Sequence, residues 1–202
     1  MSTLGDLRTR IYDEIHQTLS TAVLNACLDA VKFYQDKRFY FNETTVNINL
    51  SLTTQYALSI IPKLIEVDTF KVYSSSTPYL VNNASWHDIE LWDSSTGSSS
   101  TPTDYSIHHE QLRIYPRPSV TLSAQVSYHK AISMSASNSS STVWTNEASD
   151  LIRYRAKGLL YASFLLDPQQ AQVENVLEAQ ALNRLFARTT KLVSSNRVKG
   201  YL

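Results

Sequence analysis

The chain has 202 residues and a mass of 22.8 kDa, and its 18 Lys plus Arg are balanced by 18 Asp plus Glu, so its formal charge is zero. Hydrophobic residues make up 43% of the chain, enough for a substantial core in one large domain or two small ones. Charged residues make up only 18%, which predicts a polar, weakly charged surface suited to packing against other protein, and the neutral balance does not favour nucleic-acid or anionic-membrane binding.

The N-terminal segment predicts two amphipathic helices. Thr3 and Asp6 have the spacing of a capping box. Apolar residues then recur at helical intervals and predict a helix over about residues 3–17; they are Leu4, Leu7, Ile11 and Ile15. A second apolar stripe begins at Leu19 and predicts a helix that ends near Arg38.

From Phe39 onward the apolar period changes to two, which predicts strands. The expected strands lie around residues 46–50, 56–58, 67–72 and 120–128, with a hairpin over residues 105–116 that turns near His108 to Gln111. This alternation favours a sheet with one solvated face. Two Ser/Thr-rich stretches, residues 94–103 and 133–142, are predicted to be exposed loops with few packing constraints.

After Trp144 the helical period returns and predicts a helix that ends near Asp167. Asp167 followed by Pro168 predicts the N-cap and first turn of a last long helix. The apolar stripe expected for this helix is Val173, Val176, Leu177, Leu185, Leu192 and Val193. Residues 194–202 lose the period and are expected to form an extended tail.

The order of elements predicts an α+β fold. We expect the N-terminal helices (residues 1–38) and the C-terminal helices (144–193) to pack as a helical bundle, because neither pair can bury its apolar stripe alone. Residues 39–143 would then form an inserted antiparallel β-sandwich or barrel-like domain, and residues 194–202 an extended C-terminal tail.

Several chemistries lack the residues that they need. The four glycines lie far apart, which excludes Gly-rich phosphate loops. Cys27 is the single cysteine and is expected to be a buried hydrophobe. The first ten residues carry charge from Asp6 onward, and no uncharged apolar run approaches the roughly 18 residues that span a bilayer. We therefore expect a cytoplasmically made chain without a cofactor or a membrane partner.

Four local patterns suggest chemistry but favour a structural reading. His108, His109 and Glu110 are adjacent on a strand, where neighbouring side chains point to opposite faces, so a metal site is not expected. Ser127 to Lys130 has S-x-x-K spacing, but here the Ser ends a strand instead of starting a helix.

The other two patterns lie among the acidic residues and the tryptophans. Paired carboxylates for glycan hydrolysis are available in two groups, Glu66 with Asp68 and Asp88 with Glu90 and Asp93, but acids at alternate strand positions usually form a solvated face. Trp86 and Trp92 have the chemistry of a sugar-stacking platform, although packing in a core or an interface is expected for both.

The charge is unevenly distributed along the chain. Residues 1–43 hold six acids and five bases, residues 44–112 hold seven acids and two bases, and residues 113–202 hold five acids and eleven bases. An acidic β segment and basic terminal helices would steer identical subunits side by side, or would fit a basic end to an acidic partner.

Four segments, in this order, resemble the head-to-tail adaptor proteins of tailed bacteriophages, particularly those of short-tailed phages. They are Thr3-Leu-Gly-Asp-Leu-Arg8 with Ile11, Gln55-Tyr-Ala-Leu58 leading to Pro62, Tyr105-Ser-Ile107, and Leu112-Arg-Ile-Tyr-Pro-Arg-Pro118. The similarity covers most of residues 3–190, and in that family a helical domain carries an inserted β domain. This chain departs from the family in having no Gly before Leu112 or Tyr56, so those turns are expected to be longer or of another type.

The resemblance implies a structural virion protein without enzymatic activity, made in the host cytoplasm and located at the head-tail interface. Such adaptors form a ring, usually dodecameric, below the portal protein and give the tail nozzle or tube protein a platform. Genomic DNA passes through the lumen without sequence specificity. We expect the chain to be monomeric alone and to assemble into its homo-oligomer on the portal.

The resemblance also suggests where these partners bind. The C-terminal tail would extend to the portal, with Arg197 and Lys199 binding acidic groups and Tyr201 and Leu202 filling pockets. Candidates for the subunit or nozzle interface are Trp86, Trp92, His108 and His109. Two alternatives stay open, namely a virion-associated glycan-binding or glycan-cleaving protein that uses Trp86, Trp92 and the nearby acids, and a nucleic-acid-binding protein that uses the basic C-terminal third.

Overall fold

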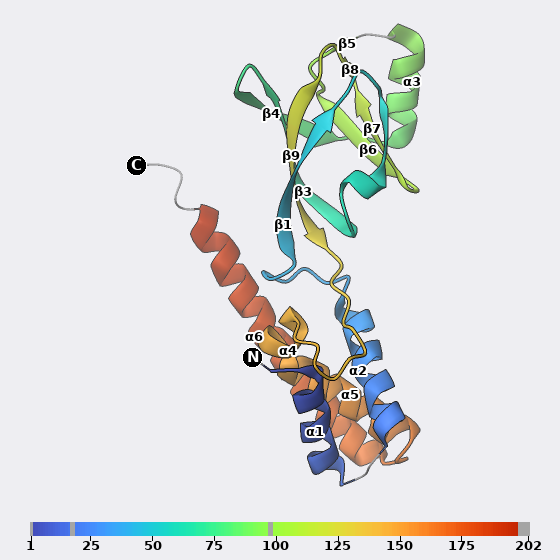
Figure 1. The fold of residues 1–202 in the computed structure, drawn as a ribbon, viewed down its shortest axis with the longest axis vertical. Helices are drawn as coiled ribbons and strands as arrows, with labels where there is room; N and C mark the ends of the chain where they lie inside the picture. Colours follow the sequence, from blue (N-terminus) through green and yellow to red (C-terminus); the bar gives the residue numbers. More distant parts are fainter. Residues whose placement is uncertain (1, 17–18, 97–98, 198–202) are drawn as a thin grey trace. The chain divides into compact units, whose positions relative to one another are not determined.

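The computed structural model describes residues 2–16, 19–96 and 99–197 (Figure 1). The chain has an α+β fold and divides into two compact units. Residues 1–41 and 132–202 form the helical unit, and Asn42–Ala131 form the β unit. These boundaries lie inside the predicted limits of 39 and 143, because Phe39, Met134 and Trp144 are buried in the core of the helical unit.

The described residues of the helical unit contain helices α1 (Leu4–Ile15), α2 (Ser20–Tyr34), α4 (Val143–Glu147), α5 (Ser149–Ser163) and α6 (Pro168–Arg197). The predicted capping box of α1 is confirmed, since Thr3 Oγ1 accepts from the Asp6 amide at 3.1 Å and Asp6 Oδ2 accepts from the Thr3 amide at 2.8 Å. Helix α5 packs against α2 and α6 (Figure 1). Side chains from α1, α2, α4, α5 and α6 share one hydrophobic core.

The stretch from residue 133 to residue 142 is a loop, as predicted, but it is constrained by packing. The carbonyls of Ser140 and Asn138 accept hydrogen bonds from the Leu4 and Gly5 amides, each at 2.9 Å. These are amides of the first turn of α1, which have no partner within the helix. Met134 is buried as well, so the loop closes the N-terminal end of α1.

Helix α6 begins as predicted, with Asp167 Oδ1 accepting from the amides of Gln169 (3.1 Å) and Gln170 (3.0 Å). Its buried face differs in part from the predicted stripe. Leu185 is buried as predicted, but Val173, Val176 and Leu192 are exposed, and the other buried positions are Ala171, Glu174, Glu178 and Ala181. The side chain of Val193 lies outside the described residues. Because Glu174 and Glu178 bind cationic and phenolic groups of the neighbouring helices, these contacts set the rotation of α6.

The C-terminal end of α6 also differs from the prediction. The helix continues to Arg197, so residues 194–197 of the expected extended tail have helical backbone. The remaining residues of that tail, 198–202, lie outside the described part of the chain.

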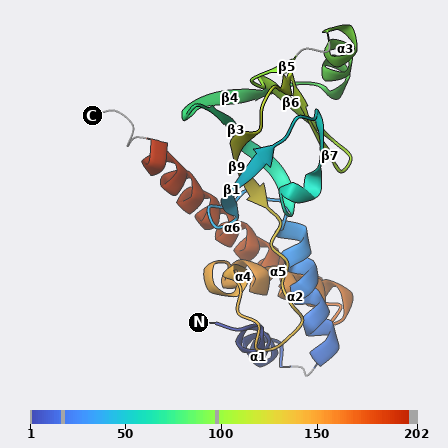
Figure 2. The ribbon, with the colours of Figure 1, turned by 45° about the horizontal axis from the view of Figure 1, so that its top comes forward.

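The β unit is built on a seven-stranded sheet with the order β1-β9-β3-β4-β6-β7-β2, curled as Figure 2 shows. The strands are β1 (Glu43–Leu50), β2 (Gln55–Ala57), β3 (Leu64–Ser74), β4 (Thr77–Asn83), β6 (Asp104–His108), β7 (Gln111–Tyr115) and β9 (Leu122–Lys130). A 3₁₀ turn (Leu58–Ile60) follows β2, and two short strands, β5 (Ser99–Ser100) and β8 (Arg117–Pro118), form a separate pair.

The sheet is mostly antiparallel, but β4 and β6 pair in parallel, and so do β5 and β8. Parallel neighbours need a crossover connection, which a helix usually provides. Helix α3 (Trp86–Thr96) lies on the connection between β4 and β6. Asp88, Glu90 and Asp93, treated above as alternate strand positions, therefore lie on a helix, and α3 occupies the start of the loop predicted over residues 94–103.

Local hydrogen bonds explain why α3 forms. Ser85 Oγ accepts from the Asp88 amide at 3.1 Å and donates to Asp88 Oδ2 at 2.6 Å, the geometry of an N-cap and its third helical residue. The predicted hairpin is confirmed as β6 and β7, joined by His109 and Glu110. His109 takes the left-handed backbone conformation (φ 51°) that a glycine would ordinarily supply at this turn.

Candidate functional site

The four predicted interface residues lie around α3 and the β6-β7 hairpin. The ring centroids of Trp86 and His108 are 5.3 Å apart, and those of His108 and His109 are 4.1 Å apart. Trp92 lies further along α3 and contacts Tyr115, with 5.6 Å between centroids. The structure thus brings Trp86, His108 and His109 into one cluster and places Trp92 against the far end of β7.

Arg113 of β7 is the central residue of this region, and the sequence analysis did not single it out. Its side chain is 9% exposed, and its guanidinium lies 2.9 Å from Asp93 Oδ2 and 3.4 Å from Glu90 Oε1. It also lies 5.4 Å from the centroid of the Trp86 ring. Trp86, Glu90 and Asp93 have the i, i+4, i+7 spacing of one helix face, a signal that is visible only if residues 86–93 are taken as helix.

The carboxylates considered for glycan hydrolysis have structural partners. Glu90 and Asp93 hold Arg113, and Asp88 Oδ2 accepts from the hydroxyl of Ser85, the N-cap of α3. In the other group, Asp68 Oδ2 lies 2.9 Å from Nδ1 of the buried His129, whose Nε2 lies 3.5 Å from Glu43 Oε1. These contacts tie α3 to β7 and join strands β1, β3 and β9, which favours a structural role for Glu90, Asp93 and Asp68.

The S-x-x-K pattern lies on strand β9. Ser127 Oγ lies 3.0 Å from Thr45 Oγ1 of β1, its cross-strand neighbour. The serine nucleophile of that motif lies at a helix N-terminus, which a serine within a strand lacks. The structure therefore favours a chance occurrence of the S-x-x-K spacing.

The outward side of α3 combines apolar and acidic groups. Leu91 is 52% exposed and Trp92 is 38% exposed, and the exposed Asp88 lies one helical turn before both. We call Asp88, Leu91 and Trp92 the α3 face. Large exposed apolar side chains next to a charged side chain are typical of contact surfaces. The α3 face is therefore a candidate interface.

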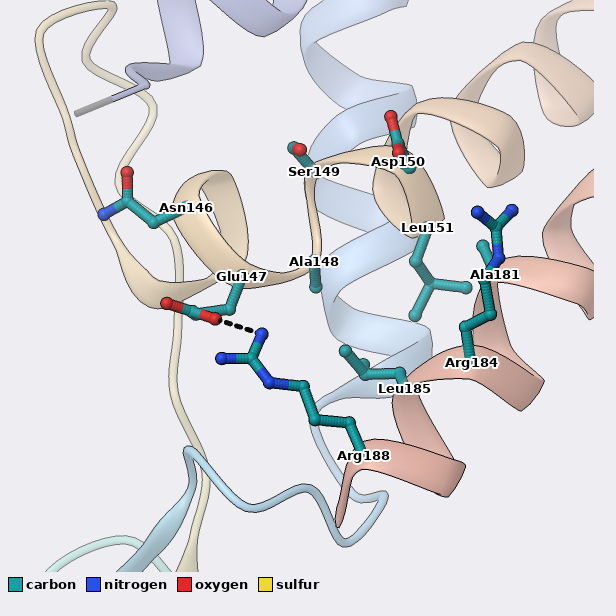
Figure 3. Close-up of a pocket in the computed structure, with 10 residues that line it drawn as sticks. All are labelled: Asn146, Glu147, Ala148, Ser149, Asp150, Leu151, Ala181, Arg184, Leu185 and Arg188. Carbon is teal, nitrogen blue, oxygen red and sulfur yellow. Dashed lines mark hydrogen bonds and ion pairs between the residues drawn. The ribbon is translucent and has the colours of Figure 1, made fainter. Parts of the chain in front are cut away.

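The helical unit carries a pocket of about 300 Å³ beside α6, shown in Figure 3. Its lining comes from the junction of α4 and α5, over residues 146–151, and from Ala181, Arg184, Leu185 and Arg188 of α6. Arg188 Nη1 lies 2.8 Å from Glu147 Oε2. We call this the α6 pocket.

Tyr40 strengthens the contact between Arg188 and Glu147. Its hydroxyl hydrogen-bonds Glu147, and the Arg188 guanidinium lies 4.6 Å from the centroid of its ring. Burial, together with the hydrogen bond to Glu147, raises the pKa of Tyr40 to about 12, so the phenol stays protonated and donates to the carboxylate at neutral pH. Arg188 is therefore engaged, whereas Arg184 lines the same pocket without a carboxylate partner among the described residues.

A second ionic cluster lies between α1, α5 and α6. Lys157 Nζ donates to Glu14 Oε2 at 2.8 Å and lies 2.7 Å from Glu174 Oε1, and Arg153 Nη1 lies 3.3 Å from Glu14 Oε1. Burial opposes ionisation of Glu14, but these cations outweigh it and lower its pKa; burial likewise opposes ionisation of Lys157, but its two carboxylate partners raise its pKa. Glu14 and Lys157 are thus charged at neutral pH, and the cluster holds the three helices together.

Most of the predicted portal-binding residues lie outside the part of the chain that the structure describes. Arg197 is the last residue of α6, while Lys199, Tyr201 and Leu202 lie outside the described residues.

Within the described part of the chain, no group of three or more His, Cys, Asp or Glu side chains is arranged to hold a metal ion. No helix there has the length and apolar character needed to cross a membrane.

No protein family model matches the chain, and no curated protein is significantly similar to it in sequence.

Proposed function

We propose that this chain is a structural virion protein, a head-to-tail adaptor of a tailed bacteriophage. Copies of it form a ring below the portal and provide a platform for the tail nozzle or tube, and genomic DNA passes through the lumen. In this role the protein has no enzymatic activity and needs no cofactor. Its partners are other copies of itself, the portal protein and the nozzle or tube protein.

The observation that carries this proposal is the insertion of the β unit into the helical unit. The chain leaves the helical unit after Phe41 and returns to it at Ile132. The two ends of the insert are adjacent, because the Lys130 amide donates to the Asn42 carbonyl at 2.9 Å. A helical domain carrying an inserted β domain is the organisation that the resemblance to adaptors implies.

The finer architecture belongs to the same proposal. We propose that the terminal helices form a helical bundle and that the β unit is a β-sandwich or barrel-like domain. Two features support this: the helices share one core, and a second core lies in the curled sheet with buried side chains from β1, β3, β4, β6, β7 and β9.

Exposed apolar side chains on both units further support a role in assembly. On the helical unit, Phe164, Leu166, Val173 and Val176 are 50% to 77% exposed. On the β unit, Leu80 is 61% exposed and Leu91 is 52% exposed. A subunit packed between neighbours would cover such groups.

Portal binding tests the proposal. We expect deletion of residues 194–202 to abolish binding to the portal protein of the same virion, because this segment carries the proposed portal-binding residues. Global stability should change little, since the last buried side chain described on α6 is Leu185. The assay is co-sedimentation with portal particles, with thermal unfolding as the folding control. Unchanged portal binding by the folded truncated protein would contradict the proposal for this segment.

The glycan alternative depends on Trp92 and the nearby acids, which contact Tyr115 and Arg113. A glycan array and zymography, each with the Trp92→Ala variant as control, separate it from the adaptor proposal. Binding or cleavage that is lost in this variant would favour the glycan function. A nucleic-acid function predicts steep salt dependence of DNA binding.

A further inference from the structure

The α3 face has the composition of one half of a specific interface. Leu91 and Trp92 supply an apolar contact and Asp88 supplies a negative charge one turn away. The inner side of helix α3 is held in place by the buried Ile89 and by the contacts of Glu90 and Asp93 with Arg113. A tryptophan on a rigid helix loses little conformational freedom on binding, which is why such residues often anchor interfaces.

The α6 pocket has complementary properties. Apolar groups of Leu151, Ala181 and Leu185 line it, and Arg184 and Arg188 stand at successive turns of α6 beside them (Figure 3). Lys191 follows one turn later on the same side of the helix and is exposed. Glu147 and Asp150 also line the pocket, but Glu147 is paired with Arg188, and Asp150 with Arg10 and Arg153. Arg184, by contrast, has no carboxylate partner among the described residues, so it is the cation of the pocket that is open to an acidic group.

We propose that the α3 face of one copy of this chain binds at the α6 pocket of the next copy. Leu91 and Trp92 make the apolar contact, and Asp88 pairs with Arg184. This inference rests on the proposed ring and deepens it by naming the two surfaces that meet. Opposite charge on the two surfaces selects a second copy as the occupant, in agreement with the acidic middle and basic C-terminal third of the sequence.

The proposed contact is heterologous, because the two surfaces differ and lie on different units. Each copy offers one α3 face and one α6 pocket, so every added copy leaves one of each free for the next. Contacts of this type close into rings when the rotation between copies allows it, whereas an interface between two identical surfaces stops at a dimer. The proposal therefore gives a subunit contact that is compatible with a ring.

Disulfide trapping tests this contact on the full-length chain in the presence of portal particles, because the chain alone is expected to be monomeric. A Leu91→Cys variant is mixed with a size-tagged Gln180→Cys variant, whose substitution lies on the exposed side of α6 one turn before Arg184. The native Cys27 gives little background, because it is buried and burial raises the pKa of its thiol to about 12. The matched control replaces Gln180→Cys with Lys32→Cys, at an exposed position on α2.

We expect the mixed dimer of the Leu91→Cys and Gln180→Cys variants to form at least tenfold faster than either homodimer or the control dimer. A mixed rate equal to that of the control would overturn the proposal. Reversing one charge, by adding Arg184→Glu to the Gln180→Cys variant, should slow the reaction about tenfold. Adding Asp88→Lys to the other partner should then restore most of the rate, and a rate insensitive to both changes would also refute the contact.

Thermal unfolding of each variant shows whether α3 and the helical unit are intact; Asp88→Lys keeps the Ser85 cap of the Asp88 amide, so α3 should persist. The two proposals fail in different ways. Rings of the wild-type chain on portal particles, together with failed trapping, would overturn this contact and leave the adaptor function standing. Efficient, charge-dependent trapping without any binding to portal would support the contact and count against the adaptor function.

Discussion

Buried charge, rather than catalytic geometry, explains most of the conspicuous ionisable residues in this protein. Arg113 links α3 to β7, His129 lies between two carboxylates, and Lys157 joins α1 to α6. A buried cation costs desolvation energy unless partners surround it, and Arg113 and Lys157 each have two carboxylates within reach. Glu90 and Asp93, two of the acids considered for glycan hydrolysis, are the partners of Arg113, and Asp68 contacts His129.

Arg113→Ala should destabilise the β unit by about 2–3 kcal/mol, because it leaves Glu90 and Asp93 without their cation and opens space beneath Trp86. Urea denaturation followed by tryptophan fluorescence measures this change. Arg117→Ala, at an exposed position on β8, serves as the control and should change the free energy of unfolding by less than about 0.5 kcal/mol. Equal effects of the two substitutions would mean that Arg113 does not anchor α3.

The Glu14 contacts predict how stability depends on pH. Because the folded-state pKa of Glu14 lies below its ordinary value of 4.5, its contribution is present at neutral pH and is lost as the pH falls through the folded-state value. Between pH 7 and pH 3 the Glu14→Gln variant should therefore lose about 1 kcal/mol less stability than the wild type. Asp13→Asn, an exposed position on the same helix, is the control. Parallel stability curves for the wild type and Glu14→Gln would rule out this contribution.

At the scale of elements, the sequence predicted most of the helices and the strongly alternating strands. The capping box at Thr3 and the Asp167-Pro168 start are local signals, and both are present in the structure. Strand β4 was missed, because its turn from β3 uses Ser75 and Ser76 with positive φ (49° and 69°) and lacks the Gly or Asn that marks such turns. Helix α3 was missed because Glu90 and Asp93 occupy its inner face, where a hydrophobic pattern expects apolar residues.

The rotation of α6 is the largest difference from the predicted elements. The apolar positions Val173 and Val176 face solvent, because Glu174 meets Lys157 and Glu178 meets Tyr34 and Arg155. Such pairing depends on side chains of other helices, so periodicity along α6 alone cannot reveal it.

This rotation predicts unequal effects for two substitutions on α6. Leu185→Ala should cost about 3 kcal/mol of unfolding free energy, because Leu185 is 7% exposed and its removal leaves a cavity. Val176→Ala should cost less than about 0.5 kcal/mol, since Val176 is 53% exposed. Chemical denaturation of the monomeric protein measures both values. The reverse order would place Val176, and not Glu174 and Glu178, on the inner face of α6.

At the scale of the whole molecule, the sequence predicted the order of helices, strands and helices and an insert in the middle of the chain. The predicted insert, residues 39–143, was longer than the observed β unit, Asn42–Ala131. The difference is a few residues at the N-terminal boundary and larger at the C-terminal boundary. At both junctions the cause is irregular backbone, around Phe39 and Met134, that packs into the helical core without any period of its own. The α3 cluster was predicted only in part, since Trp86, Trp92, His108 and His109 were named but Arg113 was not.

The nested organisation predicts that the β unit folds alone. Residues 42–131, expressed as a separate protein, should give a cooperative unfolding transition, because they hold their own hydrophobic core and their ends are joined by the Lys130 to Asn42 hydrogen bond. Circular dichroism and thermal unfolding measure this. A fragment without a cooperative transition would show that the β unit depends on the helical unit.

Electron microscopy of the purified chain mixed with the portal protein of its virion tests the adaptor function most directly. We predict a monomer for the chain alone and a closed ring of copies on the portal particle. In the Arg184→Glu variant the rings should be fewer or incomplete, and in the variant that lacks residues 194–202 they should be absent. Portal particles that stay bare at saturating concentrations of the folded wild-type chain would contradict the proposed function.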